Sequence, residues 1–148
     1  MKKVRSWVEV DAAPATVWAV LADFDTYPEW NPVEISMKGE PVTGTVLEHT
    51  QRLTPDGKAR TFRPTIVAAT PGEELAWRGK VYIPGVFDVL HRFWLEPLDD
   101  GRRTRLHQDE DFSGLLVPLS GKAIGETERA FAIANTAIKA RAESREQS

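Results

Sequence analysis

The spacing of apolar residues predicts a strand at the start of the chain, followed by two short helices. Residues 4–10 alternate in part between apolar and polar side chains, which is typical of a strand. A helix is predicted over residues 14–22, because a proline occupies its first position and apolar residues recur every three to four positions. Prolines at positions 28 and 32 leave room for about one more helical turn, between Asp25 and Glu29.

The pattern changes to strands between residues 33 and 113. Six segments in this region are each bounded by turn residues, including Pro-Gly and Asp-Gly pairs. They are Val33–Lys38, Thr45–Leu53, Thr61–Ala69, Glu74–Val81, Val86–Leu95 and Arg103–Phe112. The connections are too short for parallel crossovers, so we expect an antiparallel meander. With the first strand, the predicted sheet has seven strands.

A helical period returns near the end of the chain. It predicts one long helix from Pro118 to Arg141, about 36 Å in length, followed by a frayed polar tail over residues 143–148. The whole chain, residues 1–148, is predicted to form one α+β domain in which the helix covers the concave face of a curved sheet. Where the sheet curls away from the helix, there is space for a cavity.

Five segments of the chain resemble the START-like helix-grip superfamily (SRPBCC), which includes polyketide cyclases and dehydrases, lipid-transport proteins and the birch-pollen allergen. The segments extend over residues 8–114, and the closing helix extends the resemblance over nearly the whole chain. They are Val8–Asp23, Phe24-x-x-Tyr27-Pro28-x-Trp30-Asn31-Pro32, Gly72–Gly79, His91-Arg92-Phe93 and Gly101–Gly114.

This resemblance implies a helix-grip fold. Its elements are a seven-stranded curved antiparallel sheet wrapped around the long C-terminal helix, with two short helices after the first strand and a hydrophobic cavity between sheet and helix. Members of the superfamily include lipid and steroid carriers, receptors and aromatic polyketide cyclases. A fold does not determine a function, so the function must be inferred from the residues that face the cavity.

Strand alternation identifies two polar residues on the cavity face. On the strand over residues 86–95, the apolar set that points inward includes His91, and on the last strand the inward set includes Glu110. A carboxylate on an apolar face has a raised pKa unless a partner holds it, which makes Glu110 a candidate for proton transfer and His91 its candidate partner. The alternatives are a structural ion pair, or a Glu110 that meets water at the cavity mouth.

The predicted ligand contacts are mainly aromatic and come from the sheet and the closing helix. They are Trp30, Trp77, Phe87, Phe93, Gln108, Phe112, Ile124, Phe131 and Asn135. Two of them have structural alternatives, because Trp30 would also serve to close the core and Asn135 to cap a backbone group.

Composition excludes several other classes of protein. The 148 residues include 19 Lys and Arg against 22 Asp and Glu, a net charge of −3, so we expect no nucleic-acid partner. No apolar run approaches the roughly 20 residues of a membrane span, and the start lacks a signal-peptide pattern, so we expect no integral membrane association and a cytoplasmic location. Without cysteines or P-loop, GxGxxG, HExxH and GxSxG motifs, we expect no metal and no cofactor.

Two functions remain open from the sequence. The first is a carrier or sensor that binds a small hydrophobic ligand of lipid, polyketide or aromatic type. The second is a polyketide cyclase or dehydratase-like enzyme, in which His91 and Glu110 supply the acid and base. Trp94, on the strand face opposite His91 and beside Leu90, suggests a surface for a partner or a homodimer.

Overall fold

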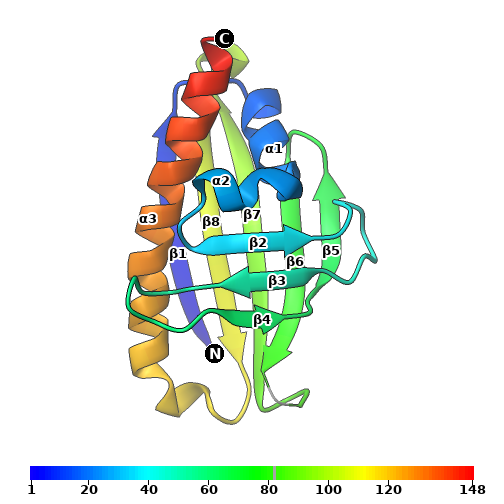
Figure 1. Cartoon of the computed structure of the whole chain (residues 1–148), viewed down its shortest axis with the longest axis vertical. Coiled ribbons are helices and arrows are strands. Elements are labelled where there is room, and N and C mark those ends of the chain that lie inside the picture. Colours follow the sequence, from blue (N-terminus) through cyan, green and yellow to red (C-terminus); the bar gives the residue numbers. More distant parts are fainter. Residues whose placement is uncertain (82) are drawn as a thin grey trace.

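A long helix runs along two packed sheets in the computed structural model, which describes residues 1–81 and 83–148 (Figure 1). The strands are β1 (Lys2–Val10), β2 (Glu34–Lys38), β3 (Glu48–Gln51), β4 (Arg60–Phe62), β5 (Thr65–Thr70), β6 (Glu74–Val81), β7 (Phe87–Leu98) and β8 (Arg103–Ser113). The helices are α1 (Pro14–Ala22), α2 (Tyr27–Trp30) and α3 (Gly121–Glu146), with short 3-10 turns η1 (Phe24–Thr26), η2 (Asp99–Gly101) and η3 (Val117–Leu119). The predicted α+β helix-grip architecture is confirmed.

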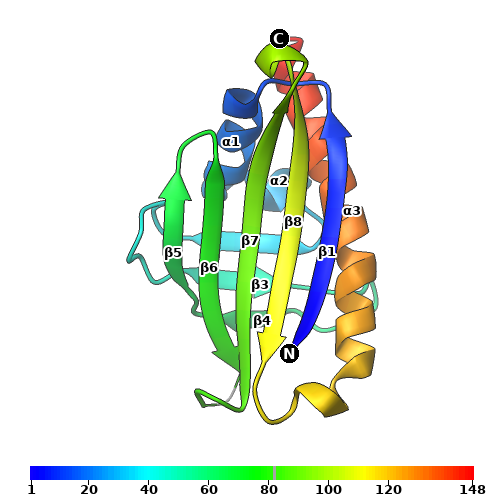
Figure 2. The ribbon, with the colours of Figure 1, turned by 180° about the vertical axis from the view of Figure 1, so that it is seen from behind.

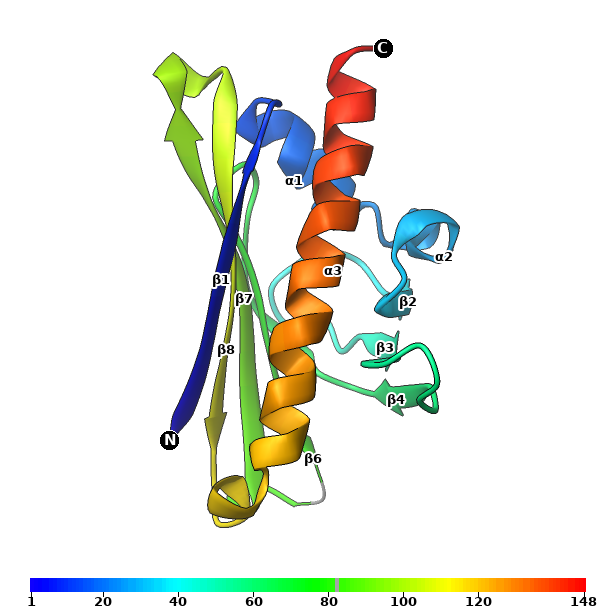
Figure 3. The same cartoon turned by 90° about the vertical axis from the view of Figure 1, so that its left-hand side faces the viewer.

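The strands form a five-stranded sheet and a three-stranded sheet, both antiparallel. The larger sheet has the order β1-β8-β7-β6-β5 and is seen face-on in Figure 2. The smaller sheet has the order β2-β3-β4 and crosses in front of the larger one in Figure 1. The side view separates the two sheets, with α3 running beside the space between them (Figure 3).

A bend at Pro64 divides the strand that the sequence predicts over residues 61–69. Its first part is β4 in the small sheet and its second part is β5 in the large sheet. Proline has no N–H for a strand ladder, so pairing on that side is interrupted there. Before the bend, β4 pairs with β3. After it, the chain pairs with the segment that precedes β3: the N–H of Leu47 donates to the carbonyl of Pro64 (2.8 Å) and that of Ile66 to the carbonyl of Thr45 (2.9 Å). The predicted seven-stranded sheet is therefore divided into two sheets. They have eight strands in total, because one predicted strand forms both β4 and β5.

The end of the chain is helical, whereas the sequence predicts a frayed tail from residue 143. Helix α3 begins at Gly121, after Pro118 in η3, and continues to Glu146. The side chain of Glu143 accepts a hydrogen bond from the backbone N–H of Asp11 (2.8 Å), and that of Glu146 accepts one from the N–H of Ala13 (2.7 Å). Contacts with the β1–α1 connection thus hold the last turns of α3.

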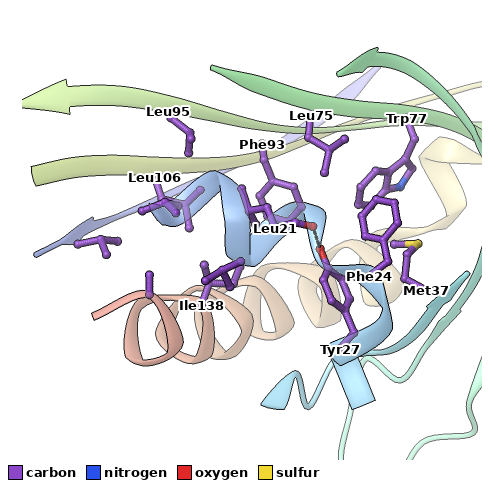
Figure 4. Close-up of a cluster of buried hydrophobic side chains, with 14 of the residues drawn as sticks. Leu21, Phe24, Tyr27, Met37, Leu75, Trp77, Phe93, Leu95, Leu106 and Ile138 are labelled. Atoms are coloured by element: carbon purple, nitrogen blue, oxygen red, sulfur yellow. Dashed lines mark hydrogen bonds between the residues drawn. The ribbon is translucent and has the colours of Figure 1, made fainter. Parts of the chain in front are cut away.

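The main core fills the space between α1, α2, the large sheet and the C-terminal half of α3 (Figure 4). Tyr27 is fully buried, and its hydroxyl donates to the carbonyl of Leu21 (2.5 Å), which ties α2 to α1. Its ring packs edge-on against Phe24 and Trp30. The proline-rich aromatic segment therefore anchors the start of β2 to the core.

We expect the change Phe93→Ala to lower the free energy of unfolding by about 3–5 kcal/mol, because it leaves a cavity in this core. Phe93 is 1% exposed on β7. Urea unfolding followed by circular dichroism measures the change. The control is Ile133→Ala on α3, where the side chain is 45% exposed, and this variant should stay within about 0.5 kcal/mol of wild type. Equal effects of the two changes would contradict this description of the core.

Candidate ligand-binding cavity

A cavity of about 500 Å³ lies between the two sheets and the first half of α3. This volume falls within the range of small-molecule sites, about 300–1,000 Å³. Its wall includes Trp77 and Gly79 from β6, Phe87, Val89 and His91 from β7, Glu110 and Phe112 from β8, His49, Gln51, Arg60 and Phe62 from β3 and β4, and Ala123, Glu126 and Thr127 from α3. Lys58, Arg60 and Lys80 are exposed side chains of this wall, so its solvent end is basic, with Glu126 as a counter-charge.

His91 and Glu110 face each other across the β7–β8 pair, as strand alternation predicts. They are partners in the strand register, and Nδ1 of His91 lies 3.5 Å from Oε2 of Glu110. The side chain of His91 is 4% exposed and that of Glu110 is 14% exposed. Trp77 stacks flat on the imidazole, with ring centroids 4.5 Å apart and planes 4° from parallel. The indole and the carboxylate together fix the orientation of the His91 ring.

His91 is held as a cation over a wider pH range than an ordinary histidine. Burial alone lowers the pKa of His91, because the charged ring loses its water. The hydrogen bond to Glu110 and the negative charges of Glu110, Glu34 and Asp109 outweigh this effect, so the pKa of His91 is raised above 6.5. The pairing with Glu110 thus favours the protonated form of the buried His91 ring in the cavity wall.

A second carboxylate, that of the buried Glu34 on β2, lies close to the same histidine. Its Oε1 is 3.9 Å from Nε2 of His91. Burial raises the pKa of Glu34 to about 7, with the charge of Glu110 adding to the shift and that of His91 opposing it. Sequence alternation misses Glu34, because it would place Glu34 with Ser36 and Lys38 on a polar face. A register shift between Glu34 and Ser36 breaks that alternation.

His49 on β3 is a further cavity residue that the sequence interpretation missed. Its ring meets Trp77 edge-on (5.7 Å between centroids), and it is 5% exposed. Burial, followed by the positive charge of His91, lowers the pKa of His49 to about 3, so its ring is neutral at physiological pH. Within the described residues its Nε2 has no hydrogen-bond partner. A neutral imidazole is thus available to a ligand oxygen or N–H.

The predicted ligand contacts divide into residues in the cavity wall and residues behind it. Trp77, Phe87 and Phe112 line the cavity. Phe131 touches the edge of His91 (5.3 Å between centroids), and Ile124 packs on the cluster formed by Phe112 and Phe131.

The remaining predicted contacts lie away from the cavity wall. Phe93 and Trp30 belong to the main core or pack against it. Gln108 and Asn135 hydrogen-bond to each other (2.7 Å), and Asn135 also donates to Ser6 (3.0 Å). This polar chain links β8, α3 and β1. A ligand would reach these four residues only if the surrounding side chains moved.

Trp94 packs on the outer face of the large sheet and is only partly exposed. It stacks on His107 with centroids 3.6 Å apart, and its Nε1 donates to Asp109 (3.0 Å). The homodimer suggested from Trp94 stays a prediction.

Two further features concern metals and membranes. Among the described residues, no three His, Asp or Glu side chains come together as ligands for a metal ion. None of the helices in the described part of the chain is long and apolar enough to cross a lipid bilayer.

The neutral state of His49 predicts a loss of stability in acid. Since the pKa of His49 is about 3 in the folded chain and near 6.5 in the unfolded chain, the unfolded chain binds the extra proton first as the pH falls. Between pH 6.5 and pH 4.5, wild type should lose about 2–3 kcal/mol more of its unfolding free energy than His49→Gln, whose amide does not titrate. Urea unfolding at both pH values measures this difference, and equal losses would contradict a buried neutral His49.

Comparisons with known proteins identify the family of the chain and its fold. The family model described as polyketide cyclase/dehydrase and lipid transport matches residues 1–143. No curated protein matches the chain.

Solved structures share the fold at low sequence identity. The Zhui aromatase/cyclase from Streptomyces sp. R1128 has a TM-score of 0.75 and 22% identity, over 97% of this chain and 94% of that one. Ara h 8.0201 has a TM-score of 0.73 and 17% identity, over 97% and 98%. One half of the di-domain ARO/CYC StfQ from the steffimycin biosynthetic pathway also matches, with a TM-score of 0.70 and 19% identity, over 99% of this chain and 52% of that one.

The family match extends over nearly the whole chain and confirms the resemblance found in the sequence. The structural matches add the fold, with its curved sheet and long closing helix. This chain belongs to the polyketide cyclase/dehydrase and lipid transport family.

Proposed function

We propose that this chain binds a small hydrophobic ligand, of lipid, polyketide or aromatic type, as a carrier or sensor. The observation that carries this proposal is the cavity of about 500 Å³ whose wall includes Trp77, Phe87 and Phe112. Aromatic walls with a few placed polar groups are typical of sites for apolar ligands, where the polar groups orient the ligand. Here the placed groups are Glu110, His91 and the neutral His49.

The cavity has an inner end and a solvent end with different polar groups, so the proposed site would orient its ligand. His49 and His91 pack against the buried Trp77, and Glu110 pairs with His91, whereas Lys58, Arg60 and Lys80 are exposed. An apolar ligand with one oxygen would place that oxygen at the His91–Glu110 pair. Its hydrocarbon surface would then contact the aromatic rings.

A second candidate function is acid–base catalysis of the cyclase or dehydratase kind. It is favoured by the His91–Glu110 pair, because a carboxylate in the cavity wall is able to accept a proton from a ligand carbon or hydroxyl. The adjacent imidazolium would stabilise the charge that develops on the ligand. Both functions use the same cavity, and they differ in whether a bound ligand is changed.

Filling the cavity should block binding. We expect Val89→Trp to weaken the affinity for a neutral fluorescent probe, N-phenyl-1-naphthylamine, by at least about tenfold, because the larger side chain projects into the ligand space. The matched control is Val42→Trp, at an exposed position outside the cavity wall, and it should bind like wild type. Fluorescence titration measures both affinities, with circular dichroism to confirm folding. Unchanged binding by Val89→Trp would place the probe elsewhere.

The enzyme alternative makes a separate prediction for Glu110. With a poly-β-ketone thioester as substrate, Glu110→Gln should lower turnover by about 100-fold or more while leaving the affinity within a few-fold, because the amide cannot accept a proton. Glu126→Gln alters the other carboxylate of the cavity wall and serves as the control. Product analysis by chromatography measures turnover. Turnover that survives in Glu110→Gln would remove this residue from the chemistry.

A further inference from the structure

Glu34 and Glu110 flank the imidazole of His91 from two different sheets. Glu110 on β8 approaches Nδ1 at 3.5 Å, and Glu34 on β2 approaches Nε2 at 3.9 Å. The side chains of Glu34 and His91 are each 4% exposed. Each nitrogen of the ring therefore has its own carboxylate.

Glu34 differs from the other two members of this cluster in its relation to the cavity. His91 and Glu110 line the cavity, whereas Glu34 is absent from its wall. Among the described residues, Oε2 of Glu34 and Nε2 of His91 have no hydrogen-bond partner. Because an unpaired buried charge is costly, the charged forms of these two groups stabilise each other.

The backbone before β2 holds Glu34 in its inward position. The side-chain oxygen of Asn31 accepts hydrogen bonds from the N–H groups of Val33 (3.0 Å) and Glu34 (2.9 Å). The register shift after Glu34 then returns Ser36 to its place in the β2–β3 ladder. This local turn aims a carboxylate at His91 from the far side of the core.

We propose that Glu34 is a positioning residue that keeps His91 protonated and paired with Glu110, and that the cavity thereby recognises a ligand hydroxyl of the phenol or enol type. The hydroxyl donates a hydrogen bond to the side-chain carboxylate of Glu110, which His91 orients from Nδ1 at 3.5 Å. This inference rests on the proposed function for the ligand, while the role of Glu34 toward His91 concerns the protein alone.

The other titratable groups near Glu34 have less influence on the protonation of His91 than Glu34 and Glu110 have. Burial, with the charges of Glu34 and Asp23 adding to it, raises the pKa of Tyr27 on α2, so this phenol stays neutral. His49 on β3 is neutral as well, because its pKa is lowered to about 3. The negative charge of Asp109, on β8, also raises the pKa of His91, with a smaller effect than that of Glu110 or Glu34. Glu34 and Glu110 are therefore the main counter-charges of His91.

Nuclear magnetic resonance tests the role of Glu34 without any ligand. The imidazole carbon and proton shifts of His91, titrated against pH, give its proton affinity, with His107 on the outer face of the large sheet as the internal reference. Glu34→Gln preserves the shape of the side chain and removes its charge, so the proton affinity of His91 should fall about tenfold. The control is Glu48→Gln on the exposed side of β3, which should titrate like wild type. An unchanged titration of His91 in folded Glu34→Gln overturns the proposal.

A reciprocal variant decides the question if Glu34→Gln fails to fold. In His91→Gln, the positive charge that lowers the pKa of Glu34 is absent. The side-chain carboxyl carbon of Glu34 should then titrate at a higher pH than in wild type. An unchanged titration of this carboxyl would overturn the pairing.

Two matched probes test the ligand class. The cavity should bind 2-naphthol more tightly than naphthalene, and Glu34→Gln should shift the pH dependence of 2-naphthol binding downward with no effect on naphthalene. Equal affinities for the two probes overturn the hydroxyl preference. If neither probe binds, the proposed function is contradicted, and the titration of His91 still decides the role of Glu34.

Discussion

The bend of the sheet at Pro64 is the constraint on which the cavity depends. Pro64 packs against Gly79 of β6, where an added Cβ would lie 3.4 Å from the proline ring. After the bend, β2, β3 and β4 lie across the large sheet (Figures 1 and 3). Side chains of both sheets line one cavity. Helix α3 runs along this space, and Ala123 and Thr127 add small side chains to its wall. A flat sheet of the same strands would offer one apolar face to the helix and leave no enclosed volume.

The bend also brings together charges that are far apart in the sequence. Glu34 and His49 come from the small sheet, whereas His91 and Glu110 come from the large one. In this buried setting, the neutral form of His49 and the cationic form of His91 are both favoured, for opposite electrostatic reasons. The cavity thus combines aromatic surface with an inner group of polar side chains, as a carrier that orients its ligand and an acid–base enzyme both require, and its solvent end is basic.

The sequence predicts the parts of this site that follow strand periodicity and misses the parts that follow from bends. Alternation along β7 and β8 places His91 and Glu110 inward, because both strands are long and regular. Glu34 escapes the same argument because a bulge follows it, and a periodicity of two does not survive a bulge.

Two other differences between the predicted and the observed fold arise from contacts between residues that are distant in the sequence. Pro64 is a local signal for a break in the predicted strand, but nothing local shows that the two parts join different sheets, or that Glu143 and Glu146 hold the last turns of α3 against Asp11 and Ala13. The predicted ligand contacts of Gln108 and Asn135 stay a prediction. Both side chains face inward as expected, but they hydrogen-bond to each other and lie outside the cavity wall.

The central claim is that an apolar molecule occupies the cavity at the His91–Glu110 pair. Native mass spectrometry of the protein isolated gently from its own host tests this claim most directly. We expect a bound species of a mass that fits about 500 Å³, released on denaturation and missing from Val89→Trp prepared in the same way. A protein that is empty in several independent preparations, or an adduct that Val89→Trp retains, would contradict the claim.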